Sequence, residues 1–406
     1  MATLIQPFRG LRPKPELAAG VAAPPYDVLN TEEARGRAAA KPNSFLHISK
    51  PEIDLAPATD PYAPEVYAKG LESLKRMEGA GVLVRDPEAH YYVYRLRMGD
   101  HVQTGFVGTA SVAAYDINRV RKHEFTRPDK EDDRVRQIEA LNAQTGPVLL
   151  AYKASKDVQA IIDTTAKGTP LYDVVADDGI AHTLWKMDDT SAIEKLTKLI
   201  DAMPALYIAD GHHRSAAASR VSAKKKTESA AYFLAVAFPH DQMRIFDYNR
   251  VIKDLNGLSP EAFLAKLRER FDVSEASGQV KPDKPTRFGM YFQGKWYKLD
   301  IHTKLIPASD PVASLDVSLL QDNLIAPVLG IADPRRDKRI DFVGGIRGLK
   351  ELEKRVNSGE MQVAFALHPT TLEQLMAVAD SNQVMPPKST WFEPKLADGL
   401  VSHVLD

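Results

Sequence analysis

The segment 210–214, Asp-Gly-His-His-Arg, gathers an acid, two imidazoles and a guanidinium around one glycine. An apolar segment, 205–208, precedes it, and small residues follow it. This pattern predicts a buried strand, a glycine turn and then a helix over 215–225. The free N–H groups and the dipole of a helix start attract an anion, and Gly211 lets a ligand approach the backbone closely. We therefore expect a phosphate-binding turn.

The side chains of this turn have separate expected roles. Arg214 can fork onto phosphate oxygens, while His212 and His213 offer donors whose charge changes near neutral pH. Ser215 adds a hydroxyl to the expected phosphate site, and Asp210 is a candidate for catalysis and for holding a metal ion. In the alternative interpretation, Asp210 only caps the helix and the histidines are solvated turn residues.

A second cluster, 121–134, mixes acids and bases around Glu124. Basic residues flank Glu124 on both sides, including His123 and Arg127. These cations would keep the carboxylate ionised and able to accept a proton from a substrate hydroxyl. Glu124, with His123 beside it, is therefore the candidate general base. The alternative is a solvated charged face, which is what mixed-charge runs usually form.

Three further cations are candidates for binding a substrate. Arg127 and Arg134 could hold a substrate carboxylate. Lys388 lies in the stretch 385–395, which combines a proline turn with two lysines, hydroxyls and aromatic residues. This stretch could close over a ligand, with Lys388 and Lys395 as phosphate donors, or it could pack as a C-terminal loop anchored by its tryptophan.

Hydrophobic periodicity predicts the elements that must position these residues. Strands are expected at 89–96 and 102–110, which form a hairpin, and at 147–152, 182–187 and 230–238; helices are expected at 132–143, 190–203 and 260–271. Interleaved strands and helices indicate a mixed α/β protein, in the α+β sense. We expect three regions: an N-terminal α+β region at 1–110, a phosphate-binding domain at 111–250 and a C-terminal α+β domain at 251–406.

The composition reduces the number of possible functions further. Of the 406 residues, 44% are hydrophobic, which is enough to give each domain a buried core. Lys plus Arg total 53 against 54 for Asp plus Glu, so we expect no nucleic-acid partner. The chain has no cysteine, which excludes disulfides, thiolate zinc sites and cysteine nucleophiles, and which suits a reducing cytoplasm.

Several other classes are disfavoured by missing signals. The longest apolar run, 230–238, is too short to span a membrane, and the first residues lack the apolar core of a signal peptide. P-loop, zincin, serine-hydrolase and dinucleotide-binding motifs are absent from the sequence. We therefore expect a cytoplasmic protein without a membrane partner.

The chain resembles the bacterial domain-of-unknown-function family 1015 over nearly its whole length. Four segments together carry this resemblance: 24–28, 123–134, 209–214 and 385–395. Within it, the region 110–240 resembles the fold shared by ParB-type CTPases, sulfiredoxins and free-serine kinases, in which a strand-Gly-x-x-Arg-helix turn holds nucleotide phosphates. Sulfiredoxin chemistry is excluded, because its catalytic cysteine corresponds to His212 here. DNA partitioning is disfavoured, because no helix-turn-helix or basic surface is evident.

The resemblance to free-serine kinases implies a nucleotide-dependent phosphotransferase that acts on a small hydroxyl substrate such as serine. His123 and Glu124 look like the His-Glu pair of those kinases, although a segment of roughly 155–201 is inserted before the turn. The expected cofactor is Mg²⁺ with ATP or ADP, and the expected partners are the nucleotide and the small substrate.

Other functions stay open at this point. A phosphoserine phosphatase would use Glu124 to activate water instead of a hydroxyl substrate. A nucleotide-binding switch would change partners without turnover. A metal site could be formed by His212, His213 and His123. A homodimer is also compatible with the sequence.

Overall fold

The computed structural model describes residues 3–406, so Met1 and Ala2, with which the expected region 1–110 begins, lie outside the described residues. The chain divides into two compact units, one of Met1–Met243 with Pro394–Asp406 and one of Arg244–Glu393. This division differs from the three expected regions. Residues 1–110 do not form a unit of their own, because three of their strands join the same nine-stranded sheet as strands of the central residues.

The first unit is built on a nine-stranded mixed sheet with the order β6-β11-β8-β12-β5-β4-β10-β9, and with β1 paired to β5. Most neighbours are antiparallel, but β11 runs parallel to β6 and β12 runs parallel to β8. The expected hairpin is confirmed as β4 and β5. The strands are β1 (Ile5–Gln6), β4 (Tyr92–Met98), β5 (His101–Ser111), β6 (Val120–Arg121), β8 (Val148–Tyr152), β9 (Tyr172–Val175), β10 (Ala181–Lys186), β11 (Leu206–Asp210) and β12 (Tyr232–Pro239).

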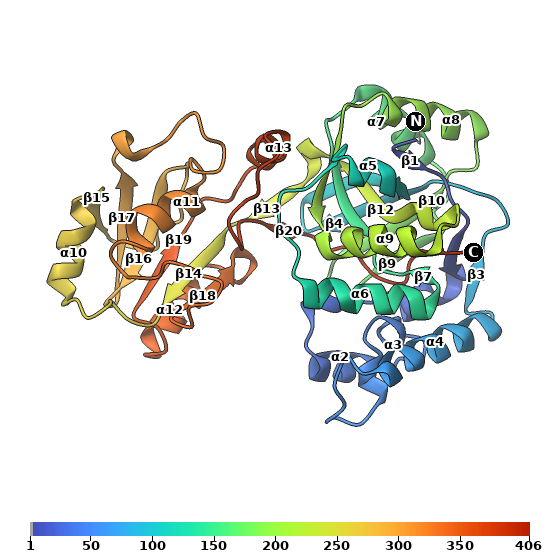
Figure 1. Cartoon of the computed structure of the whole chain (residues 1–406), viewed down its shortest axis with the longest axis horizontal. Helices are drawn as coiled ribbons and strands as arrows, with labels where there is room; N and C mark the ends of the chain where they lie inside the picture. Colours follow the sequence, from blue (N-terminus) through green and yellow to red (C-terminus); the bar gives the residue numbers. More distant parts are fainter. Residues whose placement is uncertain (1–2) are drawn as a thin grey trace. The chain divides into compact units, whose positions relative to one another are not determined.

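Helices surround this sheet, and several begin at residues that satisfy free N–H groups. Ser155 accepts from the backbone of α7, and Asp189 accepts from that of α8. Figure 1 shows α6 and α9 running side by side, and Ile138 of α6 packs with Ala217 and Val221 of α9. The helices are α1 (Ala18–Val21), α2 (Thr31–Ala38), α3 (Leu46–Ser49), α4 (Pro64–Gly79), α5 (Val112–Asp116), α6 (Pro128–Leu141), α7 (Lys156–Thr165), α8 (Thr190–Asp201) and α9 (His212–Lys225).

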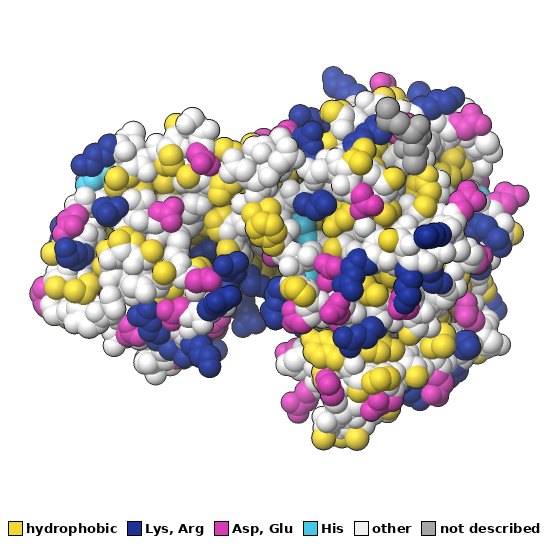
Figure 2. Space-filling model, viewed as in Figure 1, with side chains coloured by type: hydrophobic (Ala, Val, Ile, Leu, Met, Phe, Trp, Pro, Cys, Tyr) yellow, Lys and Arg dark blue, Asp and Glu magenta, His cyan; other side chains and the backbone are white. Residues whose placement is uncertain are grey.

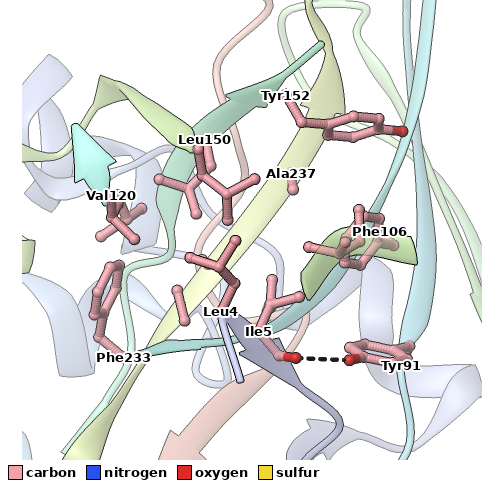
Figure 3. Close-up of a cluster of buried hydrophobic side chains, with 14 of the residues drawn as sticks. Leu4, Ile5, Tyr91, Phe106, Val120, Leu150, Tyr152, Phe233 and Ala237 are labelled. Carbon is pink, nitrogen blue, oxygen red and sulfur yellow. Dashed lines mark hydrogen bonds between the residues drawn. The ribbon is translucent and has the colours of Figure 1, made fainter. Parts of the chain in front are cut away.

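The main core of this unit joins strands that lie far apart in the sequence. Figure 3 shows side chains from β1, β5, β6, β8 and β12 converging, and the hydroxyl of Tyr91 donates to the Ile5 carbonyl at 3.0 Å. Tyr91, Phe106 and Tyr152 are fully buried there. Burial of a large apolar side chain contributes about 1.5–3 kcal/mol, so this cluster fixes the sheet that carries β11.

A small sheet ties the end of the chain to the first unit. The strand β21 (Ser402–Val404) pairs with β2 (Gly10–Pro13) and β7 (Ala143–Gln144), and β2 also pairs with β3 (Leu83–Arg85). Ahead of β21, Ala23 and Asp398 exchange backbone hydrogen bonds. The last residues of the chain therefore lie in the same unit as β11 and α9.

Gly105 lies where the strands β5 and β12 approach each other too closely for a side chain. A Cβ atom at Gly105 would overlap the Ala237 carbonyl and would lie 2.8 Å from the Phe238 ring. We expect Gly105→Ala to lower the free energy of unfolding by about 3 kcal/mol, because both neighbours are buried and cannot move away. Urea denaturation measures this.

The matched control is Gly36→Ala in α2, where an added Cβ would meet nothing within 4 Å. Because alanine favours helix, we expect this change to raise stability by up to about 1 kcal/mol. Equal effects of the two substitutions would contradict the close approach at Gly105.

The second unit contains a six-stranded antiparallel sheet with the order β15-β17-β16-β19-β14-β18, and a separate antiparallel pair of β13 and β20. The strands β16 and β17 form an antiparallel hairpin whose turn contains Gly294. The elements are β13 (Arg244–Phe246), β14 (Tyr248–Ile252), α10 (Pro260–Arg268), β15 (Phe271–Ala276), β16 (Arg287–Phe292), β17 (Lys295–Ile301), α11 (Asp316–Leu320), β18 (Ile340–Gly344), α12 (Leu349–Asn357), β19 (Val363–Ala366), α13 (Leu372–Asp380) and β20 (Trp391–Glu393).

Asp316 of α11 predicts a pH effect on stability. Burial raises the pKa of Asp316 to about 7, and hydrogen bonds from Thr286 and His368 only partly oppose this. The folded state therefore holds the proton more tightly than the unfolded state, so stability falls as the pH rises from about 4 to about 7. Between pH 5 and pH 8 we expect a loss of about 2–3 kcal/mol from this group.

The substitution Asp316→Asn should remove this loss, because the amide oxygen can still accept from Thr286 as Oδ1 does at 2.8 Å. Urea midpoints at pH 5 and pH 8 test it. The variant and the original protein should have similar stability at pH 5, with the variant more stable at pH 8. Parallel pH profiles would show that Asp316 is not protonated in the folded state.

Candidate functional site

The strand-turn-helix pattern around Gly211 is confirmed, but the helix begins earlier than expected. Strand β11 ends at Asp210, Gly211 adopts a positive φ of 98°, and α9 begins at His212 instead of Ser215. Only glycine takes this conformation without strain, and a Cβ there would lie 3.1 Å from the Arg214 guanidinium. The turn therefore requires glycine, and His212 to Arg214 form the first turn of the helix.

This first turn presents backbone donors. The earliest N–H that bonds within α9 is that of Ser215, which donates to the Gly211 carbonyl at 3.0 Å. The N–H groups of His212, His213 and Arg214 precede it and have no acceptor within the helix. With the helix dipole, these three groups favour an anion at the turn.

Asp210 lies beside this helix start as a paired carboxylate. Its Oδ2 atom is 3.6 Å from both Lys395 Nζ and Arg214 Nη2, and its Oδ1 atom accepts from the Gly211 N–H at 2.8 Å. Burial pushes the pKa of Asp210 upward, but Lys395, Arg214 and the Gly211 amide outweigh it and hold the pKa well below the usual value. Asp210 is therefore ionised, and its carboxylate can help to bind a further cation.

Arg214 is held in position by its surroundings. Its side chain is 10% exposed, and Nη1 donates to the Pro147 carbonyl. Burial opposes its charge, but Asp210 and Asp27 keep its pKa above the usual value. The turn thus contains a fixed cation whose other N–H groups lie near Asp210.

His212 and His213 fasten the loop that carries Glu124. His212 Nε2 accepts from the backbone N–H of His123 at 3.4 Å, and His213 Nε2 accepts from that of Arg127 at 3.0 Å. Burial lowers the pKa of both rings, so both are neutral and both carry their proton on Nδ1. These two histidines therefore bind the loop as acceptors.

His123 and Glu124 lie against the start of α9. Glu124 Oε2 is 3.9 Å from His212 Nδ1, and the rings of His123 and His212 meet edge to face at 4.5 Å. Burial lowers the pKa of His123 to about 4, which the Ile208 carbonyl and Asp210 only partly oppose. The Glu124 side chain is 49% exposed, so a carboxylate accessible to solvent lies next to two neutral imidazoles.

Arg134 and Arg214 both line a cavity of about 30 Å³. Tyr26 and Asp398 line the same cavity. The Arg134 guanidinium stacks on the Tyr26 ring at 3.8 Å and donates to Asp133 at 2.6 Å. Burial raises the pKa of Asp398 to about 7, although Arg214 and Arg134 oppose this. The cavity is large enough for ordered water, and both charged and apolar side chains line it.

The other predicted residues lie differently. The Arg127 side chain is 70% exposed and pairs with Asp129 at 2.9 Å. Ser215 is fully buried, and its hydroxyl donates to the His212 carbonyl at 3.1 Å, so it serves the helix backbone. Lys388 belongs to the unit 244–393, where its ammonium lies 5.6 Å from the centre of the Tyr248 ring.

Three side chains reach this site in a way that the sequence did not indicate. Lys395 was expected only as a phosphate donor in the stretch 385–395, whereas the structure brings it to Asp210. Asp398 had no sequence signal, because its role depends on the chain end returning to the first unit. Tyr26 lies in the segment 24–28, which the family resemblance had pointed to without a role.

The surface around α6 and α9 has no dominant charge. Figure 2 shows acidic and basic side chains intermingled there, and Arg220 pairs with Glu131 and Asp132 while Lys224 pairs with Glu139.

Among residues 3–406, none of the helices is long and apolar enough to cross a bilayer.

The fold and the turn define a mixed α/β protein in which a strand, a glycine turn and a helix start meet at residues 210–214. The chain belongs to the family described as protein of unknown function (DUF1015), whose model matches residues 5–318. None of the curated proteins matches this sequence.

Solved structures give distant likenesses. A mutant free serine kinase in complex with AMP is 12% identical, covers 72% of this chain and 91% of its own, and has a TM-score of 0.37. A conserved hypothetical protein from Pyrococcus furiosus is 15% identical over 71% and 92% of the two chains, with a TM-score of 0.35. C-terminally truncated SbnI from Staphylococcus aureus is 11% identical over 72% and 85%, with a TM-score of 0.39. TM-scores below 0.5 carry no argument about this site, and the ParB/sulfiredoxin-like assignment stays a prediction.

Proposed function

We propose that this protein is a nucleotide-dependent phosphotransferase that acts on a small hydroxyl compound, with serine as the first candidate. The observation that carries the proposal is the distance of 3.9 Å between Glu124 and His212. His212 is the first residue of α9, so a candidate base and a candidate phosphate site adjoin the same residue.

The phosphate part of the proposal rests on three backbone N–H groups and a fixed guanidinium. The N–H groups of residues 212–214 have no acceptor within α9, and Arg214 is oriented by Pro147. Phosphoryl transfer needs mostly positioning and charge stabilisation, and both are available at a preorganised helix start.

The chemical part rests on Glu124. Its carboxylate is half-exposed, so an incoming hydroxyl can reach it, and it faces the neutral imidazole of His212. Glu124 would accept the proton as the hydroxyl oxygen attacks the terminal phosphorus of the nucleotide, while the bond from that phosphorus to its bridging oxygen breaks and the shortened nucleotide leaves. His212 would keep the carboxylate oriented, because the His123 N–H fixes the ring and leaves the proton on Nδ1.

Asp210 is the residue that would hold Mg²⁺. Its pKa is held low, so it is ionised next to the proposed phosphate position, and it would otherwise repel a phosphate. Mg²⁺ binds oxygen ligands and supplies neutralisation of phosphate charge in phosphoryl transfer. The donor type of Asp210 therefore fits this ion.

One observation favours the hydrolytic direction as a second candidate. Because the Glu124 side chain is 49% exposed, water reaches the same carboxylate as a substrate hydroxyl would. A phosphatase acting on phosphoserine would use the same phosphate site with Glu124 activating water. Products separate the two: a kinase forms a new phosphomonoester, and a phosphatase forms inorganic phosphate.

A thermal-shift screen tests the binding part. Purified protein is melted with Mg²⁺ and ATP, ADP, CTP, serine or phosphoserine, because a ligand that binds only the folded state raises Tm. We expect a nucleotide to raise Tm, and serine or phosphoserine to increase the shift. If no nucleotide raises Tm at millimolar concentration, the proposed nucleotide site is wrong.

A further inference from the structure

His123 is a buried imidazole without the partners that a buried imidazole needs. It is 2% exposed, and neither ring nitrogen meets a partner in hydrogen-bonding geometry among residues 3–406, although the Ile208 carbonyl lies close enough to favour the charged ring. Leaving a buried polar group unpaired costs about 1–3 kcal/mol, so native proteins rarely do so without a reason. This unpaired imidazole is adjacent in sequence to Glu124 and packs on His212.

These three side chains have the composition of a metal site. Donor atoms of His123, Glu124 and His212 all lie within 4.8 Å of one another. In a tetrahedral zinc site, ligands at about 2.0–2.1 Å from the ion are roughly 3.4 Å apart, so a small inward movement would close the set. The Glu124 side chain is 49% exposed, so it has room for this movement, in which it would exchange its present contacts for the ion.

We propose that His123, Glu124 and His212 bind a divalent transition metal ion of the zinc type. Two imidazoles and one carboxylate suit Zn²⁺ and disfavour Mg²⁺, which prefers oxygen ligands. The site is therefore distinct from the Mg²⁺ role given to Asp210. Three protein ligands leave a fourth position for water or a hydroxyl, which such an ion acidifies.

The structure also excludes one expected ligand. His213 Nε2 already accepts from the Arg127 N–H at 3.0 Å, and this histidine is not part of the cluster. Glu124 takes its place as the third ligand. The sequence left open a metal site formed by three histidines. The proposed site has two histidines and one glutamate instead.

Binding has a cost that the structure identifies. His212 Nε2 accepts from the His123 N–H, so Nδ1 carries the proton that faces Glu124. An ion bound at Nδ1 displaces that proton to Nε2 and gives up this bond, which is long at 3.4 Å. The site therefore selects ions with a strong preference for imidazole.

Zn²⁺ and an attacking hydroxyl would compete for the Glu124 carboxylate, so the metal-bound state and the state proposed for phosphoryl transfer are separate states of this site. Metal binding is measured without any turnover, so its outcome does not depend on the outcome for phosphoryl transfer. Full-length protein is freed of metal with a chelator and dialysed against Zn²⁺ in excess Mg²⁺, and bound zinc is measured by elemental analysis. We expect one equivalent of Zn²⁺ per chain. Co²⁺ should give the intense visible bands of a four-coordinate site, and the weak bands of six-coordinate Co²⁺ would overturn the proposal.

His123→Leu and the control His302→Asn complete the test, because His302 pairs with Asp272 at 3.5 Å and is not part of the proposed site. We expect His123→Leu to weaken Zn²⁺ binding by roughly two orders of magnitude, since the loss of an outer partner alone costs about 10- to 100-fold. Its metal-free Tm should not fall, because an unpaired polar group is replaced by an apolar one. His302→Asn should keep the ion. Less than stoichiometric zinc, zinc retained by His123→Leu, or zinc lost from His302→Asn would each overturn the proposal.

Discussion

Glu124→Gln is expected to lower the rate of phosphoryl transfer by about 10²- to 10⁴-fold and to leave nucleotide affinity nearly unchanged. Glutamine keeps the shape of the side chain but cannot accept the proton from the attacking hydroxyl. The nucleotide site is formed by the backbone of α9 and by Arg214, which the substitution does not alter. Single-turnover kinetics and isothermal titration calorimetry measure the two quantities separately.

The matched control is Glu139→Gln on α6, where the carboxylate only pairs with Lys224 on the surface at 2.6 Å. Its removal should cost little stability and no activity, since surface ion pairs contribute about 0–1 kcal/mol. If Glu124→Gln behaves like Glu139→Gln in every assay, Glu124 is not a base, and a nucleotide-binding switch becomes the better account.

Arg214→Lys is expected to weaken nucleotide binding by about 10- to 100-fold, the range given by one or two hydrogen bonds to a charged group. Lysine keeps the positive charge that Asp210 faces at 3.6 Å, so the turn should still fold. Lysine lacks the planar guanidinium of arginine. In the proposed complex, Arg214 would use its other N–H groups to bind phosphate oxygens while Nη1 donates to the Pro147 carbonyl. Calorimetric titration with the nucleotide that raises Tm measures the change.

Arg220→Lys is the matched control, because it lies on the same helix and pairs with Glu131 and Asp132 at the surface. It should bind nucleotide like the original protein. Affinity that falls equally in both variants would point to a general charge effect, and affinity unchanged in Arg214→Lys would remove the nucleotide phosphates from this turn.

The turn itself was predictable, because its determinants are local. An apolar run, a glycine and small residues define a strand, a turn and a helix without any distant contact. The error of three residues at the start of α9 has a physical reason. Glycine with a positive φ occupies the cap position, so residues 212–214 become helical although histidine is a weak helix former.

The meeting of Glu124 with α9 was not predictable from periodicity. It depends on β6, a strand of two residues whose Val120 and Arg121 pair in parallel with Leu206 and Tyr207 of β11. Parallel neighbours leave the sheet at the same edge, so the residues that follow each strand meet there. A strand this short gives no recognisable pattern in the sequence.

The segment of roughly 155–201, which the family resemblance predicts to be an insertion, leaves this meeting intact for a topological reason. Its strands β9 and β10 join the far end of the sheet from β6 and β11. Asp398 shows the opposite case, since it lines the cavity next to Arg214 only because the chain end returns to the first unit. Such long-range returns have no local signal.

Phosphorus NMR of a reaction mixture tests the central claim most directly. Protein, Mg²⁺, serine and either ATP or ADP are incubated, and the phosphorus resonances are followed over time. Phosphoryl transfer predicts a new phosphomonoester resonance that grows as the terminal phosphate of the nucleotide is lost, with Glu124→Gln as the inactive reference. An unchanged spectrum, or inorganic phosphate as the sole product, would contradict phosphoryl transfer to serine at this site.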